Sequence, residues 1–177
     1  LAYADRAEYL GDPDFVDIPL EGLISKAYAD ELAQLITDKA TPAQAIKPGN
    51  PLPFESDQTT HYSIMDKDGN AVAVTYTLNT NFGTGIVAEG TGILLNNEMD
   101  DFSAKPGVAN AYGLVGGEAN AVAPGKRPLS SMTPTLLLKD GQPVLVTGTP
   151  GGARIITTVL QSVTNLVDYD MNPAESA

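Results

Sequence analysis

Two hairpin patterns constrain the fold of this chain more than any other feature of its sequence. In the first, the β-type runs THYSIMD and AVAVTYTLN flank a tight-turn sequence, Lys67–Asn70. In the second, TPTLLLK and PVLVTGT flank Asp140 and Gly141. Strands that are joined by such short turns pair antiparallel. The sequence therefore predicts an α+β fold with antiparallel sheets rather than a parallel doubly wound sheet.

The first turn also resembles the start of a calcium-binding loop, because Asp66, Asp68 and Asn70 alternate along it. A loop of the EF-hand type needs a glycine after the third of these ligands and a glutamate at its twelfth position. This chain has Ala71 and Thr77 at those positions. We therefore interpret the segment as a hairpin turn and expect no metal ion there.

Helical patterns precede and follow the hairpins. Apolar residues recur at helical spacing near residues 22–38, and the runs LAYADRAEYL and ARIITTVLQSVTNLVDY also indicate helices. Residues 40–58 contain four prolines and are predicted to form an extended linker. The run GILLNN, residues 92–97, is predicted to be a further strand. Residues 98–128 are rich in Gly, Ala and Asn and are predicted to form long ordered loops.

The composition excludes several classes of function. The 177 residues suffice for one domain with a sizeable core, and 42% of them are hydrophobic. A net charge of −12 argues against nucleic acid or an anionic membrane as a partner. The chain has no cysteine and one histidine, so we expect neither a disulfide nor a zinc site. Its apolar runs are too short to span a membrane.

Both ends of the chain indicate a piece of a longer protein. The first residue, Leu1, already lies in a helical pattern. At the other end, Asn172 is a good helix N-cap, Pro173 suits the first helical position, and Glu175 completes a capping box. Almost no helix follows this start signal, so we expect that the sequence continues beyond Ala177.

Three segments could carry chemistry, and each has a plainer alternative. Gly148–Gly152 precedes a helix and could bind an oxyanion or carboxylate through backbone N–H groups, or could be a flexible turn. Asn96–Phe102 holds two amides and three carboxylates, which could bind an ammonium group or form a solvated loop end. Lys126–Met132 places paired hydroxyls beside a basic pair, and could bind a carboxylate or be an ordinary loop.

The hydroxyls of Thr59 and Thr60 adjoin His61, the only histidine. A hydroxyl beside an imidazole is typical of a nucleophile with its general base. A catalytic histidine, however, usually has a carboxylate that orients it, and the sequence offers no obvious candidate. His61 is therefore more simply interpreted as a packed, hydrogen-bonded residue on a strand.

Taken together, the motifs resemble the γ-glutamyltransferase (γ-glutamyltranspeptidase) family of N-terminal nucleophile hydrolases. The resemblance covers nearly the whole chain and rests on five ordered segments: YADRAEYLGDPDF, DQTTHYSIMDKDGNAVAVTYTLNTNFGTG, GILLNNEMDDFSAKPG, GKRPLSSMTPT and VTGTPGGARIITTVLQ. It implies part of an αββα sandwich with antiparallel sheets. Much of a large subunit and the end of a small subunit would be absent from this fragment.

The resemblance also implies that a precursor cleaves itself at Gln58–Thr59. Residues 1–58 would then be the tail of the large subunit, and residues 59–177 the first part of the small, catalytic subunit. The new N-terminal amine of Thr59, with a reference pKa of about 7.7–8.0, would serve as the base for the Thr59 hydroxyl. No cofactor and no metal ion would be needed.

Residue roles follow from matching the family's motifs position by position. The resemblance implies that Thr77 hydrogen-bonds the nucleophile Thr59. It implies a set of ligands for the substrate's α-ammonium group: Asn79, Glu98 and Asp101. It implies that Ser130 and Ser131 bind the α-carboxylate of the substrate. It also implies that Gly151 and Gly152 form the oxyanion hole. Family members carry Gln or Glu at the position of Glu98, and they add an α-carboxylate arginine from a part of the large subunit outside this chain.

The implied substrates are glutathione and other γ-glutamyl compounds, with water, amino acids or peptides as acceptors. A cephalosporin (glutaryl) acylase of the same superfamily is the alternative enzyme, and a folded but unprocessed, non-catalytic form is the alternative from another class. The rest of the large subunit and of the small subunit would be partners. Family resemblance further implies a periplasmic or secreted protein.

Overall fold

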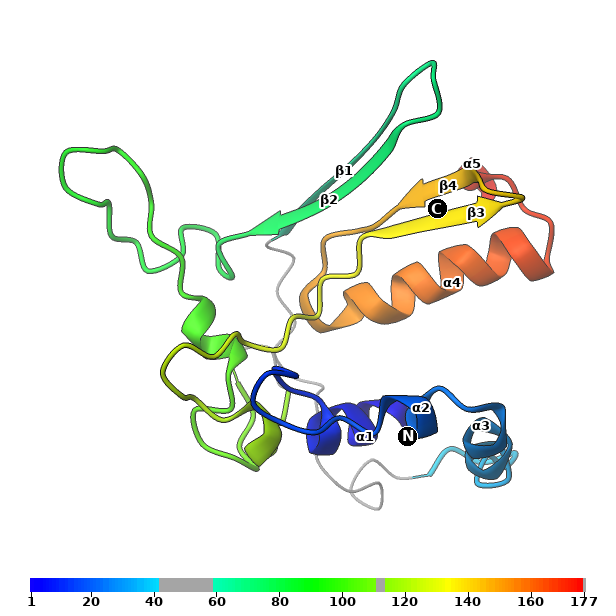
Figure 1. Cartoon of the computed structure of the whole chain (residues 1–177), viewed down its shortest axis with the longest axis horizontal. Coiled ribbons are helices and arrows are strands. Elements are labelled where there is room, and N and C mark those ends of the chain that lie inside the picture. The colour runs from blue at the N-terminus through cyan, green and yellow to red at the C-terminus, as the bar shows by residue number, and fades with distance from the viewer. Residues whose placement is uncertain (42–58, 111–113, 177) are drawn as a thin grey trace. The chain divides into compact units, whose positions relative to one another are not determined.

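A computed structural model of the chain describes residues 1–41, 59–110 and 114–176. The chain forms two compact units, each built from two separate segments. One unit combines Leu1–Phe54 with Glu98–Ser130, and the other combines Glu55–Asn97 with Ser131–Ala177. Figure 1 shows helices mixed with antiparallel hairpins, which confirms the predicted α+β class. Most of the predicted linker at residues 40–58 lies outside the described residues, and so does Gln58, the residue before the predicted cut.

The first unit begins with three short helices: α1 (Ala2–Tyr9), α2 (Leu20–Leu23) and α3 (Lys26–Ala33). The helix at the start of the chain is confirmed, but the single helix predicted near residues 22–38 is wrong. Ser25 interrupts it, because its extended backbone ends α2 and its side chain accepts a hydrogen bond from the Tyr28 N–H to cap α3. Apolar periodicity continues across this break and therefore does not reveal it.

The described residues of the second segment, Glu98–Ser130, form mainly loops, as the sequence predicts. The described part of this segment includes the 3₁₀ helices η2 (Glu98–Asp101) and η3 (Glu118–Asn120), and residues 111–113 between them lie outside the described chain. The backbone N–H of Gly117 donates to the carbonyl of Ala7 on α1, at 2.8 Å. The loops are thus fastened to the first helix.

The first hairpin of the second unit pairs β1 (Thr59–Met65) with β2 (Ala71–Thr77). The Asp66 carboxylate accepts hydrogen bonds from the backbone N–H groups of Asp68 and Asn70, at 2.9 Å each. Asp66 therefore closes the turn, which confirms the hairpin interpretation of this acidic segment.

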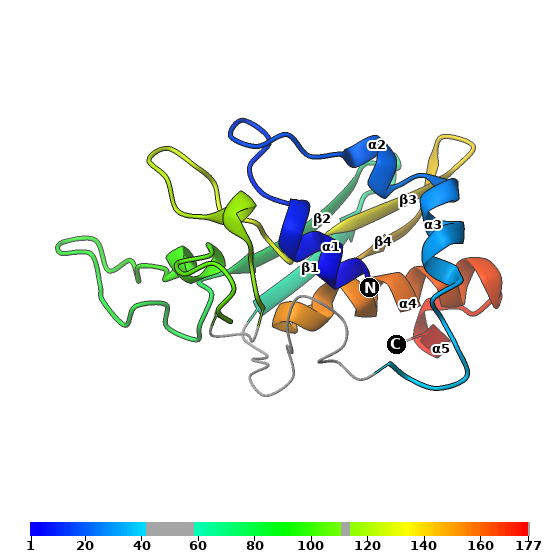
Figure 2. The same ribbon diagram turned by 90° about the horizontal axis from the view of Figure 1, so that it is seen from below.

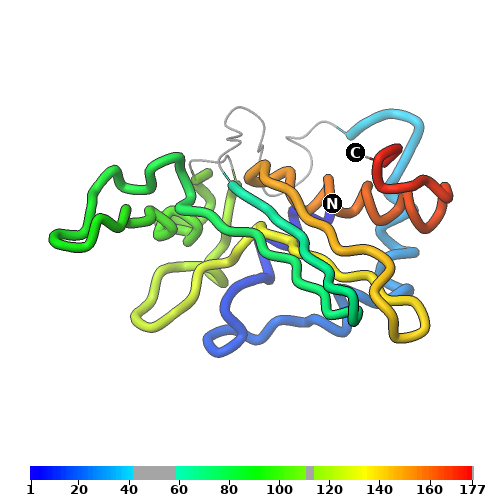
Figure 3. The backbone as a smooth tube through the Cα atoms, turned by 90° about the horizontal axis from the view of Figure 1, so that it is seen from above, coloured from blue at the N-terminus to red at the C-terminus, as the bar shows by residue number. Residues whose placement is uncertain are grey.

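The second hairpin pairs β3 (Thr135–Lys139) with β4 (Gln142–Thr147), with an irregularity after Leu137. Strand β4 contacts both strands of the first hairpin, and Figure 3 shows the two hairpins side by side. The predicted strand at residues 92–97 is wrong, because this run forms only an isolated bridge between Leu94 and Val87.

The long helix α4 (Ile155–Asp168) follows the second hairpin and runs beside it (Figure 2). Ile155 is only 1% exposed and Val159 is also buried, so the start of α4 carries much of the core of this unit. The predicted capping box opens α5 (Pro173–Ser176): Asn172 accepts from the Glu175 N–H, and Glu175 accepts from the Asn172 N–H. Among the described helices, none is both long and apolar enough to cross a membrane.

Candidate active site

Thr59 and Thr77 form the last pair of the β1–β2 ladder, at the end remote from the turn. Both residues are half-buried. Cβ atoms of directly opposed residues in an antiparallel pair lie about 4.5–5.5 Å apart, close enough for two short hydroxyl side chains to interact. The Thr77 Oγ1 also accepts a hydrogen bond from the backbone N–H of Asn79, at 2.9 Å. Thr77 therefore links the start of β1 to the segment that follows β2.

Asn79 occupies a constrained position directly after β2. It is 3% exposed, and its φ of 76° lies in the left-handed region, which asparagine tolerates better than most residues. Its side-chain amide donates to the carbonyl of Asn97, at 3.2 Å. The polar side chain is therefore held inside the protein at the same end of the hairpin as Thr59.

The surroundings of His61 are those of a structural residue. Its Nδ1 lies 2.8 Å from the Thr75 hydroxyl and its Nε2 lies 3.0 Å from the Ser63 hydroxyl. The ring packs against Gly148, where a Cβ atom would overlap it. Burial lowers the pKa of His61. Both ring nitrogens are engaged by hydroxyls, and among the described residues no carboxylate orients the ring, which supports the interpretation of His61 as a packed, hydrogen-bonded residue.

Gly151 and Gly152 form the connection from β4 into α4. Their φ angles of 135° and 53° lie in regions that favour glycine, and Gly151 is buried. The Arg154 N–H donates to the Gly151 carbonyl at 3.0 Å, which closes the short 3₁₀ helix η4 (Gly152–Arg154) before α4. The double glycine is thus required by the backbone conformation itself, and its role as an oxyanion hole stays a prediction.

In the first unit, η2 brings the carboxyl groups of Glu98 and Asp101 together. Burial, and then the hydrogen bond and negative charge of Asp101, raise the pKa of Glu98 to about 7. Burial also raises the pKa of Asp101, although its hydrogen bond with Glu98 and the positive charge of Arg6 act against this. Two neighbouring carboxyl groups in a partly buried site share a proton near neutral pH.

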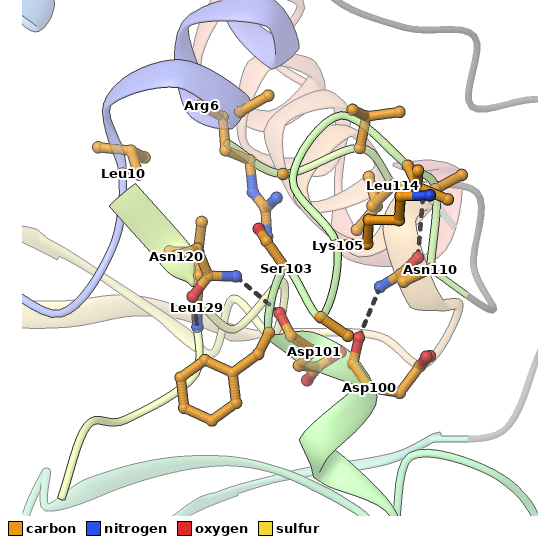
Figure 4. Close-up of a pocket in the computed structure, with 17 residues that line it drawn as sticks. Arg6, Leu10, Asp100, Asp101, Ser103, Lys105, Asn110, Leu114, Asn120 and Leu129 are labelled. Carbon is orange, nitrogen blue, oxygen red and sulfur yellow. Dashed lines mark hydrogen bonds between the residues drawn. The ribbon is translucent and has the colours of Figure 1, made fainter. Parts of the chain in front are cut away.

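Arg6 on α1 faces the same loops and was missed by the sequence analysis. With Asp101, Ser103 and Asn120 it lines a cavity of about 120 Å³, shown in Figure 4. Burial lowers the pKa of Arg6, while Tyr3 and Asp101 partly oppose the shift. Nothing in the helical run around Arg6 distinguishes it from a surface arginine, so only the folded chain reveals it.

Ser130 and Ser131 follow a loop that is tied down by its basic pair. Arg127 binds Asp12 through its backbone N–H at 2.9 Å and its Nε at 3.0 Å, and its guanidinium also contacts Asp14. The Lys126 ammonium donates to the Ala119 carbonyl at 2.8 Å. The two cations thus hold the loop itself, and the role of Ser130 and Ser131 as carboxylate ligands stays a prediction.

Asp12 is buried, and its hydrogen bonds from the Arg127 side chain and backbone hold its pKa well below the usual range. The carboxylate therefore stays ionised at any physiological pH and keeps the arginine in place. The two partners are 115 residues apart in the sequence, so no local pattern could have indicated the pair.

The candidate residues divide between the two units. Six lie in the unit that contains the hairpins: Thr59, Thr77, Asn79, Ser131, Gly151 and Gly152. Three lie in the unit that contains α1: Glu98, Asp101 and Ser130. Thr59, Thr77 and Asn79 lie at one end of the β1–β2 hairpin, and Glu98 and Asp101 lie on the 3₁₀ helix η2. Their union in one site stays a prediction.

The chain is similar in sequence and in structure to several known proteins. It is 69% identical to the glutathione hydrolase proenzyme of Escherichia coli over 176 residues, which cover 99% of this chain and 30% of that protein. A mutant γ-glutamyltranspeptidase from Helicobacter pylori has a TM-score of 0.64 at 61% identity, over 66% of this chain and 63% of that one. Cephalosporin acylase from Bacillus halodurans has a TM-score of 0.77 at 30% identity, over 99% of this chain and 29% of that one.

The chain spans about 30% of the length of the curated Escherichia coli protein, so it corresponds to one part of that relative. The sequence pattern of the family described as Gamma-glutamyltranspeptidase matches residues 1–177, the whole of the chain. This match, with the identities above, confirms the resemblance that the motifs indicated: the chain belongs to the γ-glutamyltranspeptidase family.

Proposed function

We propose that this chain is the central part of a glutathione hydrolase and γ-glutamyltransferase whose nucleophile is Thr59. The observation that carries the proposal is the position of Thr59 at the first residue of β1, opposite Thr77 at the last residue of β2. The 69% identical relative is named a glutathione hydrolase proenzyme, which supports both the activity and a cleaved precursor.

In the proposed processing step, the Thr59 hydroxyl attacks the carbonyl carbon of Gln58. The C–N bond to Thr59 breaks as an ester forms, and water hydrolyses the ester to release a Gln58 carboxylate. Thr59 is then N-terminal, and its free α-amine can take the proton of its own hydroxyl. The single cleavage thereby releases the α-amine of Thr59, which serves as the general base in every later turnover.

In the proposed turnover, the Thr59 oxygen attacks the γ-carbonyl of the substrate and forms a γ-glutamyl ester. The amine leaves with the proton held by the Thr59 amine, and water or an acceptor amine then resolves the ester. Backbone N–H groups of Gly151 and Gly152 stabilise the tetrahedral oxyanion, and Thr77 orients the nucleophile. None of these acyl-transfer steps changes an oxidation state, so no redox cofactor is needed, and the proposed base and oxyanion hole are groups of the chain itself.

Two sets of side chains would select an α-amino acid. Asn79, Glu98 and Asp101 bind the α-ammonium group, which carboxylates and amide oxygens suit. Ser130 and Ser131 donate hydrogen bonds to the α-carboxylate. Two acidic residues already share a partly buried site on η2, and a bound ammonium ion would relieve the repulsion between them.

Other parts of the protein would complete the site. We propose that residues 1–58 end the large subunit, that residues 59–177 begin the small one, and that the missing parts add the α-carboxylate arginine and complete an αββα sandwich. The two β-hairpins and α4 supply suitable layers for one side of that sandwich. We also propose a periplasmic or secreted location, on family resemblance alone.

A cephalosporin acylase is the second candidate, because the chain resembles one over 99% of its length. That likeness is at 30% identity, against 69% for the glutathione hydrolase proenzyme. A glutaryl side chain also lacks the α-ammonium group that Glu98 and Asp101 would bind. The acidic pair on η2 therefore favours γ-glutamyl substrates.

The test is to purify the full-length protein and compare hydrolysis of a γ-glutamyl anilide with that of the matching glutaryl anilide. We expect the γ-glutamyl compound to be preferred, and two chains to appear on a denaturing gel. A preference for the glutaryl compound would favour the acylase. An intact precursor in which no break at Gln58–Thr59 can be induced would show the protein to be a non-catalytic form.

A further inference from the structure

Asn120, the last residue of η3, is buried, with 5% of its surface exposed. Its side-chain Nδ2 donates to the main-chain carbonyl of Asp101, at 2.7 Å. Its Oδ1 accepts from the main-chain N–H of Leu129, at 3.0 Å. Figure 4 shows the amide between these two segments. One side chain therefore spans two loops that are distant in sequence.

The amide orientation follows from its partners. A carbonyl can only accept a hydrogen bond and an N–H can only donate one, so Nδ2 must face Asp101 and Oδ1 must face Leu129. A third hydrogen bond joins the same segments: the main-chain carbonyl of Asn120 accepts from the main-chain N–H of Ser103, at 2.9 Å. Asparagine is the shortest side chain that offers both a donor and an acceptor in one plane.

The two segments that Asn120 joins each lead to a proposed substrate ligand. Asp101 is a proposed ligand of the α-ammonium group, and Leu129 directly precedes Ser130, a proposed ligand of the α-carboxylate. In an α-amino acid these two groups share one carbon atom, so their protein ligands must be held at a fixed separation. We propose that Asn120 is a positioning residue that sets this separation, an inference that rests on the proposed function.

The same unit offers a matched control. Asn110 also bridges two backbone groups: it donates to the Asp100 carbonyl at 3.4 Å and accepts from the Leu114 N–H at 2.9 Å. It therefore anchors the neighbouring residue of η2, but to a loop that leads to no proposed ligand. Loss of either amide leaves two backbone groups without their partners. Asn110 is half-buried and Asn120 is buried, so Asn110→Ala is the milder change, and denaturant unfolding of both variants measures that difference separately from KM.

The experiment uses the full-length protein with Asn120→Ala or Asn110→Ala, assayed with a γ-glutamyl anilide. Asn120→Ala should raise KM about tenfold or more and change kcat far less, because misplaced ligands weaken recognition of the α-amino acid while Thr59 is untouched. Processing at Gln58–Thr59 should persist, since that step binds no amino acid. Asn110→Ala should leave KM within about threefold of the wild-type value.

Equal effects of the two variants on KM, or a fall in kcat at constant KM, would overturn the proposal. If Asn120→Ala fails to fold, Asn120→Asp, which keeps the acceptor for Leu129, is assessed by the same criteria. If neither variant is processed, the role of Asn120 is purely structural, and the proposal is overturned. Activity of the wild-type protein reports on the proposed function separately. A wild-type protein without γ-glutamyl activity would refute that function, and the role of Asn120 with it.

Discussion

Thr59 and Thr77 face each other at the open end of the β1–β2 hairpin, separated from the turn by every other pair of the ladder. The register of seven residue pairs therefore decides which side chain lies beside Thr59, the proposed nucleophile. Side chains alternate between the faces of a strand, so a slip of one residue would turn Thr77 away from Thr59. The hairpin turn at Asp66 lies at the far end of the ladder. It helps to fix the register and therefore the pairing of Thr59 with Thr77.

Replacement of Thr59 by alanine should abolish both processing and turnover, because in the proposed mechanism one hydroxyl performs both attacks. In the full-length protein, Thr59→Ala should give a single chain by intact mass and no release of the anilide product. Thr60→Ala is the matched control, since Thr60 is exposed and its side chain lies on the opposite face of β1. Processing in Thr59→Ala at the normal position would contradict the assignment.

Thr77→Val keeps the shape of the side chain but removes its hydroxyl. We expect processing and kcat to fall roughly tenfold to a hundredfold, the equivalent of one hydrogen bond to a polar or charged group. Thr77→Ser keeps the hydroxyl and should retain most of the activity. A valine variant as fast as wild type would show that Thr77 does not orient the nucleophile.

Glu98 should give the protein a pH dependence near neutrality. Its pKa is raised to about 7, so the folded state keeps a proton that the unfolded chain loses near pH 4.3. The contribution of Glu98 to the free energy of unfolding should therefore decline as pH rises from about 4.3 through about 7.

Substrate binding should show the opposite trend. An ammonium group binds best to ionised carboxylates, so KM for a γ-glutamyl anilide should fall as pH rises through about 7. Glu98→Gln should flatten both the stability profile and the KM profile, measured from pH 5 to pH 9. Unchanged profiles in this variant would assign the titration to another group.

His61 and Gly148 should matter to folding and not to chemistry. A methyl group in Gly148→Ala would overlap the His61 ring, and overpacking of this kind costs about 1–3 kcal/mol of stability. The double variant with His61→Ala should recover part of that loss, as denaturant unfolding would show. His61→Ala alone should remain processed and active; a folded but inactive variant would instead make His61 a catalytic group.

Local features of the fold were predictable from the sequence, because their signals lie within a few residues. The turn at Asp66–Asn70, the capping box at Asn172 and the long helix that became α4 are examples. The break at Ser25 and the missing strand at residues 92–97 were not predicted. In both cases the apolar residues were identified correctly, but a side-chain cap in the first case, and pairing limited to one isolated bridge in the second, decided the structure.

The candidate site was predictable only through family resemblance. Composition left the double glycine at Gly151 and the acidic residues near Glu98 open to plainer interpretations. The residues that support the site depend on partners far along the chain: Arg6 faces Asp101, and Asn120 bridges Asp101 and Leu129. Such pairings leave no periodic or short-range pattern, so they become visible only once the chain is folded.

The compact unit that contains Asp12 and Arg127 is built from segments on both sides of the proposed cut. Before the cut, these segments find each other within one molecule, at a cost that grows only slowly with loop length. After the cut, the same contacts join two separate polypeptides, and their association depends on protein concentration. After dilution out of denaturant, the precursor should therefore refold even at low protein concentration. The two mature chains should recover only at high protein concentration. Self-cleavage would make maturation a one-way event, with the uncut chain acting as the template for its own assembly.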